Sequence, residues 1–302
     1  MRYQEVIPAV FLERPNRFIA LVLVNGQTER VHVKNTGRCR ELLIAGCTVY
    51  LAAGKNPSRK TKYDLIAVEK VLPDSTALLI NIDAQAPNAA AEEWLHTGAL
   101  FPPAAEIRRE VTYGNSRFDF CITHGETTAF LEVKGVTLEQ NGVVSFPDAP
   151  TERGTKHLLE LAACRQKGYE AYLLFVVQLK GAEQFRPNDS MDPAFGKALR
   201  HAVDSGVQIL AMDCVVTPDS MTIDQPVPLQ GCFIGHSNSL LQCVPVIVGQ
   251  QIQRNLQFLI RHTAALPKQS HLPVCDTHGI ACFCCRFGIG CPLCCTFFLP
   301  QR

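Results

Sequence analysis

The feature that most constrains the fold is a series of short segments rich in β-branched residues within residues 1–82. Each segment has the length and composition of a strand, and Asn, Gly and Pro residues between the segments mark turns. The predicted strands cover residues 17–24, 29–33, 47–52 and 64–71, and one helical turn is expected at residues 40–44. Several short strands in so small a segment favour a closed all-β barrel, of which the OB-fold is one form.

The pattern changes after residue 82, where strand-like and helical segments alternate. Helices are predicted over residues 89–95, 151–167 and 193–204, with a further helix beginning in 104–110. Strands are predicted over residues 117–123, 128–136, 171–179 and 207–212, the first two forming a hairpin. A hairpin followed by helix, strand, helix and strand indicates an α/β domain with a mixed sheet and flanking helices. We therefore expect a second domain over residues 83–230.

The composition shifts again in residues 231–302, which we interpret as a Cys-rich appended tail. Nine of the fourteen cysteines lie there, whereas the other five are scattered singly and are expected to be reduced core cysteines. A zinc site is one alternative, with Cys291 and Cys294 as half of the ligands, but the remaining Cys spacings are irregular. A membrane-peripheral extension is another. The odd composition favours translation in a non-native frame.

The charge of the chain is unevenly distributed. Residues 1–82 hold 12 Lys and Arg against 7 Asp and Glu, a net charge of +5, whereas residues 83–224 hold 12 against 20, a net charge of −8. A basic module beside an acidic one favours attraction of a polyanion to the first, although a surface of this charge also serves solubility alone. The chain shows neither a secretory signal nor a membrane-spanning run, so we expect a cytoplasmic protein with no membrane partner.

The strongest chemical motif is Asp119 followed thirteen residues later by Glu132-Val133-Lys134. Alternate residues of a strand share a face, so Glu132 and Lys134 point the same way, and the hairpin can place Asp119 beside them. Two adjacent carboxylates favour a hard divalent cation, Mg²⁺ or Mn²⁺, and the lysine suits an attacking water or a phosphoryl transition state. Glu110 is the expected third carboxylate, with Glu106 as substitute. The alternative is an exposed salt bridge on a hairpin.

Basic side chains form two further candidate sites. In the first domain, the expected phosphate contacts lie after the Asn35-Thr36-Gly37 turn and in a single crowded loop, and they are Arg38, Arg40, Lys55, Arg59, Lys60 and Lys62. In the second domain, Arg153, Lys156 and His157 follow a Pro-flanked Asp148 at a predicted helix start, where a phosphate could bind. The alternatives there are a helix cap formed by Asp148 or Thr151 and a partly buried, hydrogen-bonded histidine.

Several of these segments resemble the sugar fermentation stimulation protein A family. The resemblance rests on four motifs in the family's order and spacing, over residues 7–229: NTGR at 35–38, SRFDF at 116–120, EVKGVTL at 132–138 and FPDAPTERGTKHLLEL at 146–161. It implies an N-terminal OB-fold followed by a PD-(D/E)xK nuclease-like domain. By position, it makes Asp119, Glu132 and Lys134 the nuclease-like triad and Glu110 the upstream acid. Residues beyond 229 have no counterpart in the family pattern.

The family resemblance also implies binding to DNA, non-specific or weakly specific, and a link to the regulation of sugar (maltose) metabolism. A nuclease fold does not by itself imply catalysis, because such scaffolds also serve for binding. Two function classes therefore remain. One is a DNA-binding regulator on a nuclease-like scaffold, and the other is a Mg²⁺-dependent phosphodiesterase acting on DNA or RNA. The sequence does not determine the oligomeric state.

Overall fold

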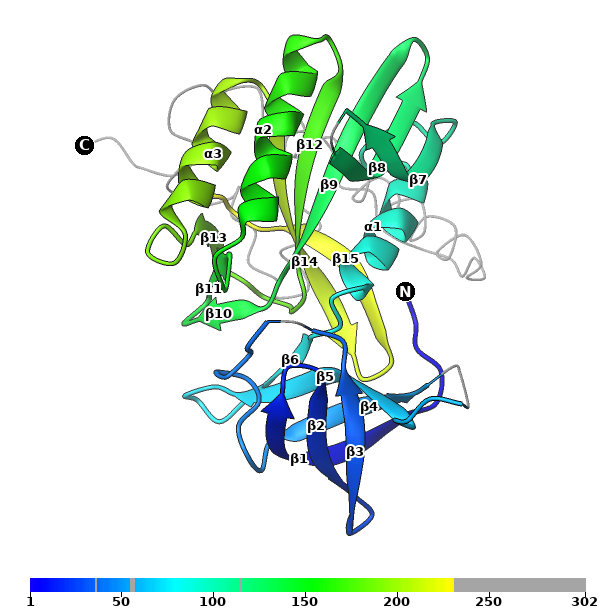
Figure 1. Ribbon diagram of the computed structural model, residues 1–302, viewed down its shortest axis with the longest axis vertical. Helices are drawn as coiled ribbons and strands as arrows, with labels where there is room; N and C mark the ends of the chain where they lie inside the picture. The colour runs from blue at the N-terminus through cyan, green and yellow to red at the C-terminus, as the bar shows by residue number, and fades with distance from the viewer. Residues whose placement is uncertain (36, 55–57, 115, 231–302) are drawn as a thin grey trace, which may run out of the picture. The chain divides into compact units, whose positions relative to one another are not determined.

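The structure, a computed structural model, describes residues 1–35, 37–54, 58–114 and 116–230 (Figure 1). The expectations for the tail, including its cysteines, lie outside these described residues. The five cysteines within them are free thiols, four buried and Cys47 partly so, which confirms the prediction of reduced cysteines. None of the described helices is long and apolar enough to cross a membrane.

Six strands form the first sheet, in the order β3-β2-β1-β4-β5-β6. β3 also pairs in parallel with β5, through His32 with Asp64 and Val33 with Leu65, and this pairing closes a five-stranded barrel. The barrel is the N-terminal OB domain expected from the family resemblance, and alternate apolar side chains fill its interior. The strands are β1 (Val6–Asn16), β2 (Ile19–Val24), β3 (Gln27–Val33), β4 (Thr48–Ala53), β5 (Tyr63–Val71) and β6 (Ala77–Asn81).

The four predicted barrel strands correspond to β2, β3, β4 and β5, and two strands were not predicted. β1 carries two prolines and irregular pairing with β2, which obscure its alternation, and β6 is only five residues long. At residues 40–44 the chain makes a hydrogen-bonded turn, with the N–H of Leu43 donating to the carbonyl of Cys39 at 2.9 Å. This bond spans four residues, as in one turn of an α-helix, and the turn does not continue into a helix.

A second sheet of six strands, in the order β15-β14-β12-β9-β8-β7, forms the centre of the second domain. β9, β12 and β14 are parallel and the outer pairings are antiparallel, so the sheet is mixed as predicted. Its strands are β7 (Glu106–Tyr113), β8 (Ser116–His124), β9 (Thr127–Val136), β12 (Glu170–Val177), β14 (Gln208–Thr217) and β15 (Ser220–Pro226). A small sheet beside it contains β10 (Leu138–Gln140), β11 (Val143–Phe146) and β13 (Gln184–Pro187).

In the described part of the chain, three helices cover this sheet: α1 (Ala86–His96), α2 (Glu152–Gln166) and α3 (Pro193–Asp204). α2 and α3 lie side by side on one face (Figure 1) and share a core cluster that includes Leu158, Phe175 and Leu199. α1 packs on a separate apolar cluster that includes Trp94 and Leu131. The two clusters show why β9 and β12 are almost continuously apolar: both of their faces are covered.

The prediction that a helix begins in residues 104–110 is wrong, because residues 106–110 belong to β7. Its Ala, Glu and Arg residues favour a helix intrinsically, but pairing along the whole of β8 determines its conformation. β7 is the edge strand of the sheet, so most of its side chains are exposed and give it no clear hydrophobic alternation.

Buried polar contacts join the barrel to the second domain. Gln178 donates from Nε2 to the backbone carbonyl of Asn81 at 3.0 Å, and Lys70 forms an ion pair with the buried Glu139 at 2.5 Å. Gly37 lies so close to the Asp148 carboxylate that an added Cβ would stand 2.5 Å from Oδ2. Two of the motifs that carry the family resemblance, NTGR and FPDAPTERG, therefore touch each other at this junction.

Candidate functional site

The hairpin of β8 and β9 brings two of the predicted acidic residues together. Phe120 pairs with Leu131, and continuing this register by one residue places Asp119 opposite Glu132. Asp119 also replaces a main-chain acceptor at this point, because its Oδ2 accepts the N–H of Val133 at 2.8 Å. The local geometry predicted from the strand pattern is therefore present.

Glu132 is buried, with only 3% of its surface exposed. Its Oε1 accepts a hydrogen bond from Lys134 Nζ at 2.5 Å and also bonds to Nδ1 of His157 on α2. Burial opposes ionisation of this carboxyl, but the hydrogen bond with His157 and the charge of Lys134 outweigh it and hold the pKa of Glu132 below its ordinary value. Glu132 is therefore a carboxylate at neutral pH, with Lys134 against it.

Asp119 has the opposite electrostatic tendency. Burial raises the pKa of Asp119 above its ordinary value, and the charge of Glu132 raises it further, whereas the N–H of Val133 and the charge of Lys134 act to lower it. Asn88 of α1 donates from Nδ2 to the other oxygen, Oδ1, at 2.8 Å. The pair thus combines one firmly ionised carboxylate with a second that resists ionisation beside it, a situation that a bound cation relieves.

One oxygen of this pair lacks a partner. Glu132 Oε2 is buried and takes part in no hydrogen bond among the described residues. In the part of the chain that the structure describes, no three His, Cys, Asp or Glu side chains form a metal-binding group. Mg²⁺ is commonly held by one or two carboxylates and keeps several waters. The donor set therefore fits such a cation, and it does not fit a metal enclosed by protein ligands.

Glu110, the predicted third carboxylate, is near the pair in the sheet but engaged elsewhere. The β7–β8 register places it opposite Asp119. Its backbone has a φ of 55°, and its Oε2 lies 2.7 Å from Nη2 of Arg117, with the side chain 46% exposed. The structure does not bring this carboxylate to Glu132. The substitute, Glu106, is 68% exposed and forms an ion pair within β7.

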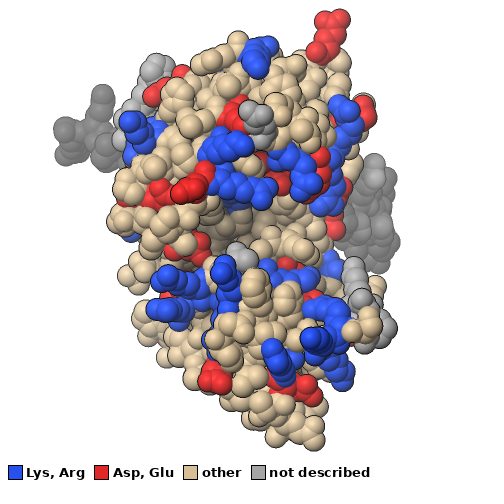
Figure 2. Space-filling model, viewed as in Figure 1, with Lys and Arg blue, Asp and Glu red and all other residues tan. Residues whose placement is uncertain are grey.

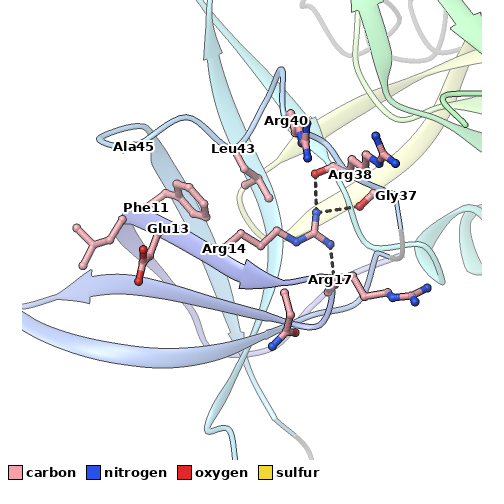
Figure 3. A pocket seen from close by; sticks show the side chains of 11 residues that line it. Phe11, Glu13, Arg14, Arg17, Gly37, Arg38, Arg40, Leu43 and Ala45 are labelled. Carbon is pink, nitrogen blue, oxygen red and sulfur yellow. Dashed lines mark hydrogen bonds between the residues drawn. The ribbon is translucent and has the colours of Figure 1, made fainter.

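Basic side chains gather over the barrel on the face shown in Figure 2. Arg38 and Arg40 are exposed, and both line a cavity of about 410 Å³ at the end of the barrel (Figure 3). Arg14 and Arg17 line the same cavity. Arg38 and Arg40, which were predicted to contact phosphate, therefore lie at one cavity with two arginines that were not predicted to do so.

The loop between β4 and β5 contains the other predicted barrel contacts. Lys55 lies outside the described residues. Arg59 is not free to bind a ligand, because its Nη2 lies 2.5 Å from Oδ1 of the buried Asp64. Lys60 and Lys62 are exposed, and Lys62 Nζ stands 4.9 Å from the ring centre of the tyrosine that follows it. This loop has less available positive charge than its sequence indicates.

The start of α2 supports the capping alternative. The Thr151 hydroxyl accepts the N–H of Gly154 at 3.1 Å, which confirms Thr151 as the helix cap. Arg153 and Lys156 are exposed on the first turns, and Lys156 Nζ lies 3.9 Å from Oε1 of Glu160. Their contact with phosphate stays a prediction.

Two residues at the acidic pair were missed or left undecided by sequence reasoning. His157 is buried and bonds to Glu132, which confirms the buried, hydrogen-bonded alternative and places this histidine at the pair. Its position four residues before Leu161 places the two side chains on one face of α2, which was the available signal for an inward position. Asn88 lies on α1, thirty-one residues before Asp119, and no local pattern connects the two.

Comparison with known proteins follows the same division. Residues 12–79 match the family described as "SfsA N-terminal OB domain", and residues 85–220 match the "Sugar fermentation stimulation protein RE domain". The "Sugar fermentation stimulation protein homolog" of Desulfitobacterium hafniense (strain DSM 10664 / DCB-2) is 52% identical over 221 residues, which cover 73% of this chain and 94% of the relative. That of Clostridium beijerinckii is 48% identical over 223 residues, covering 74% and 96%.

A solved structure agrees with the sequence relatives. "The structure of Pyrococcus Furiosus SfsA in complex with Ca2+" superimposes with a TM-score of 0.68 at 27% identity, covering 76% of this chain and 98% of that one. Both halves of the described chain thus match one family, in order and over nearly the full length of its members. This chain belongs to the sugar fermentation stimulation protein family.

Proposed function

We propose that this protein binds DNA, with little or no sequence preference, and that its nuclease-like domain holds a divalent cation, Mg²⁺ or Mn²⁺, at Asp119 and Glu132. The observation that carries the proposal is the buried Glu132 with one unpartnered oxygen, opposite a second carboxylate that resists ionisation. The Pyrococcus structure is a complex with Ca²⁺, which supports a divalent site in the family. The names of the relatives support a role in regulating sugar metabolism.

The residues around the pair divide the work of such a site. Glu132 supplies a ligand oxygen whose charge is kept by His157 and Lys134. Asn88 and the N–H of Val133 fix the orientation of Asp119 by bonding one carboxylate oxygen each, at 2.8 Å. A cation bound there would neutralise the two carboxylates and attract a phosphate of the nucleic acid. We propose that Glu110 becomes a third ligand when the cation is bound, and that its carboxylate then leaves Arg117.

A second candidate function is hydrolysis of a phosphodiester in DNA or RNA. It is favoured by Lys134, whose Nζ lies 2.5 Å from Glu132 with 16% of its side chain exposed. An ammonium group in this place can hold an attacking water and stabilise negative charge that develops on the phosphoryl oxygens. Binding and cleavage use the same fold, so the carboxylate pair alone does not separate them.

We propose the following division of the chain: residues 1–82 as the nucleic-acid-binding domain, residues 83–230 as the nuclease-like domain and residues 231–302 as an appended segment. The net charge of +5 over residues 1–82, against −8 over residues 83–224, supports the first assignment. Within the barrel, the exposed arginines at the cavity are better placed for a phosphate backbone than Arg59, which pairs with Asp64.

The test is incubation of the purified protein with supercoiled plasmid and with single-stranded DNA, each with and without Mg²⁺ or Mn²⁺. Mobility shifts report binding and nicking reports cleavage. Binding without nicking supports the proposed function. Metal-dependent nicking that is lost in Lys134→Ala, while the variant still binds DNA, supports the second candidate. If the protein gives no mobility shift and no nicking at low salt, both candidate functions are contradicted.

A further inference from the structure

We infer that the cavity at the end of the barrel binds a single-stranded nucleic acid, with phosphates held by Arg17, Arg38 and Arg40 and a base stacked on Phe18. The inference rests on the proposed nucleic-acid binding and deepens it, because it names the state of the strand and the binding face. This face lies at the β1–β2 and β3–β4 loops, and not at the β4–β5 loop where the sequence concentrates its lysines.

The first observation is that Arg14 holds both loops in place. Its Nη1 donates to the carbonyls of Gly37 and Arg38 at 2.8 and 2.7 Å, and its Nη2 donates to that of Arg17 at 2.6 Å (Figure 3). Nη2 also donates to the carbonyl of Asn35 at 2.6 Å. One planar guanidinium therefore orders the backbone on both sides of the cavity. Because both terminal nitrogens of Arg14 are used in these bonds and its Nε is buried, other side chains must contact the ligand.

The second observation concerns those other side chains. Arg17, Arg38 and Arg40 are exposed, line the cavity and lie around the guanidinium end of Arg14 in Figure 3. No ion pair between described residues involves any of the three. Among the described residues that line the cavity, Glu13 is the one that is acidic, against four arginines, so this lining is positive. Exposed guanidinium groups carried by two loops around one cavity suit the closely spaced charges of a phosphodiester backbone.

The third observation is an exposed aromatic ring beside one of these arginines, Arg17, at the edge of the cavity lining. Phe18 is 49% exposed, although its backbone is fixed at both ends. Its N–H donates to Oδ1 of Asn16 at 2.9 Å, and its carbonyl accepts the N–H of Val33 at 2.8 Å. The guanidinium carbon of Arg17 lies 5.5 Å from the ring centre. A single exposed Phe is common on protein surfaces, but one whose backbone is fixed beside an arginine of the cavity provides a surface on which a base can stack.

Stacking determines which form of nucleic acid fits. The bases of a duplex are already stacked on each other, so Phe18 can take up a base only from an unpaired strand. Arginine contacts to phosphates alone would not make this distinction. A face that combines three arginines with one aromatic ring is therefore expected to prefer a single strand, and DNA and RNA share the chemistry it recognises.

The test measures fluorescence anisotropy of labelled oligo(dT) and oligo(rU) of about twelve nucleotides and of a duplex of the same length, because one OB-fold covers about 4–16 nucleotides. Four variants of the full chain are compared: Phe18→Ala, Phe18→Trp, the triple variant Arg17→Ala/Arg38→Ala/Arg40→Ala and the control Arg30→Ala. Arg30 is an exposed arginine of the same barrel that does not line the cavity. Thermal melting of each variant shows that it is folded.

We expect the wild type to bind the single strands more tightly than the duplex. Phe18→Ala should weaken single-strand binding about tenfold, and Phe18→Trp should restore it. The triple variant should lower the slope of log K against log salt by about 2, since each phosphate contact contributes about 0.7 for single strands. Arg30→Ala should leave affinity and slope nearly unchanged. The single strand that binds more tightly, oligo(dT) or oligo(rU), identifies whether DNA or RNA is the preferred nucleic acid.

Three outcomes overturn the inference, and they show whether the proposed function fails with it. If the wild type binds nucleic acid but Phe18→Ala and the triple variant bind equally well, the binding face is elsewhere and only this inference fails. The same holds if the duplex binds more tightly and Phe18→Ala has no effect. If the folded wild type binds none of the three probes at low salt, the proposed function fails with it.

Discussion

Asp119 closes the hydrogen-bond ladder of its hairpin with a side chain, because its Oδ2 accepts the N–H of Val133 at 2.8 Å. Main-chain pairing between β8 and β9 runs from His124 with Thr127 to Phe120 with Leu131 and stops at this point. The carboxylate is thereby fixed beside Glu132, whose own carboxylate meets Lys134 and His157. The contacts of these two carboxylates, together with the ion pair of Arg59 and Asp64 in the barrel, determine how the protein should respond to substitution.

Substitution of His157 should destabilise the protein in a pH-dependent way. His157→Ala leaves the buried Glu132 with one fewer hydrogen bond, which should lower the free energy of unfolding by roughly 2 kcal/mol at pH 7. Because the pKa of Glu132 is depressed in the fold, its contribution is present above the ordinary glutamate pKa and is lost as pH falls through the folded value. The difference between wild type and variant in urea unfolding should therefore shrink below about pH 4. A difference independent of pH would contradict this.

Asp119→Asn should stabilise the metal-free protein. The pKa of Asp119 is raised by burial and by Glu132, so its ionised form costs free energy in the fold. The penalty is absent below the ordinary aspartate pKa of about 4 and complete above the raised folded value. In chelator, the variant should melt a few degrees above the wild type at pH 7 and level with it at about pH 4. Asn88→Ala is the control, since it removes a hydrogen bond to Asp119 and should not stabilise.

Arg59 should prove structural, although the sequence places it among basic loop residues. Arg59→Ala removes two contacts to the buried Asp64, from Nη1 at 3.0 Å and from Nη2 at 2.5 Å. We expect a loss of roughly 2 kcal/mol in the free energy of unfolding and little change in DNA affinity below the melting temperature. Lys60→Ala is the matched control and should leave stability unchanged. A large loss of DNA affinity in a stable Arg59→Ala variant would return the binding face to this loop.

A chain ending at Gln230 should fold and bind DNA like the full chain. Gln230 is still part of the fold, because its N–H donates to the carbonyl of Phe185 at 2.8 Å. The relatives from Desulfitobacterium and Clostridium match nearly their whole length within about three quarters of this chain. The measurements are thermal melting, DNA affinity and zinc content of both chains. Stoichiometric zinc in the full chain, or failure of the shorter chain to fold, would show that residues 231–302 contribute.

The sequence was informative where local spacing determines structure. Alternation on one strand was enough to place Glu132 and Lys134 on one face, and the turn after Thr123 was enough to predict the hairpin that brings Asp119 opposite. The interpretation of Thr151 as a cap needed only its position before a helix. The family resemblance added the OB and nuclease-like domains, which the comparisons show.

The parts that were missed depend on contacts between distant segments. Asn88 reaches Asp119 only because α1 packs against the sheet, and Arg14 meets the 35–38 loop only because the barrel closes. Arg59 appeared available because its partner Asp64 is buried by tertiary packing, and burial is not visible in a loop sequence. The segment 104–110 was misassigned for the same reason: pairing with β8 overrides its helical propensity.

Calorimetric titration of Mg²⁺ and of Mn²⁺ into wild type and Asp119→Asn tests the central claim, that Asp119 and Glu132 form a divalent-cation site. We expect one cation per wild-type chain, a matching rise in melting temperature because the cation binds only the folded state, and loss of both effects in Asp119→Asn. Lys134→Ala should still bind, since lysine is not a ligand. Equal binding by wild type and Asp119→Asn, or no binding by the wild type up to millimolar metal, would contradict the claim.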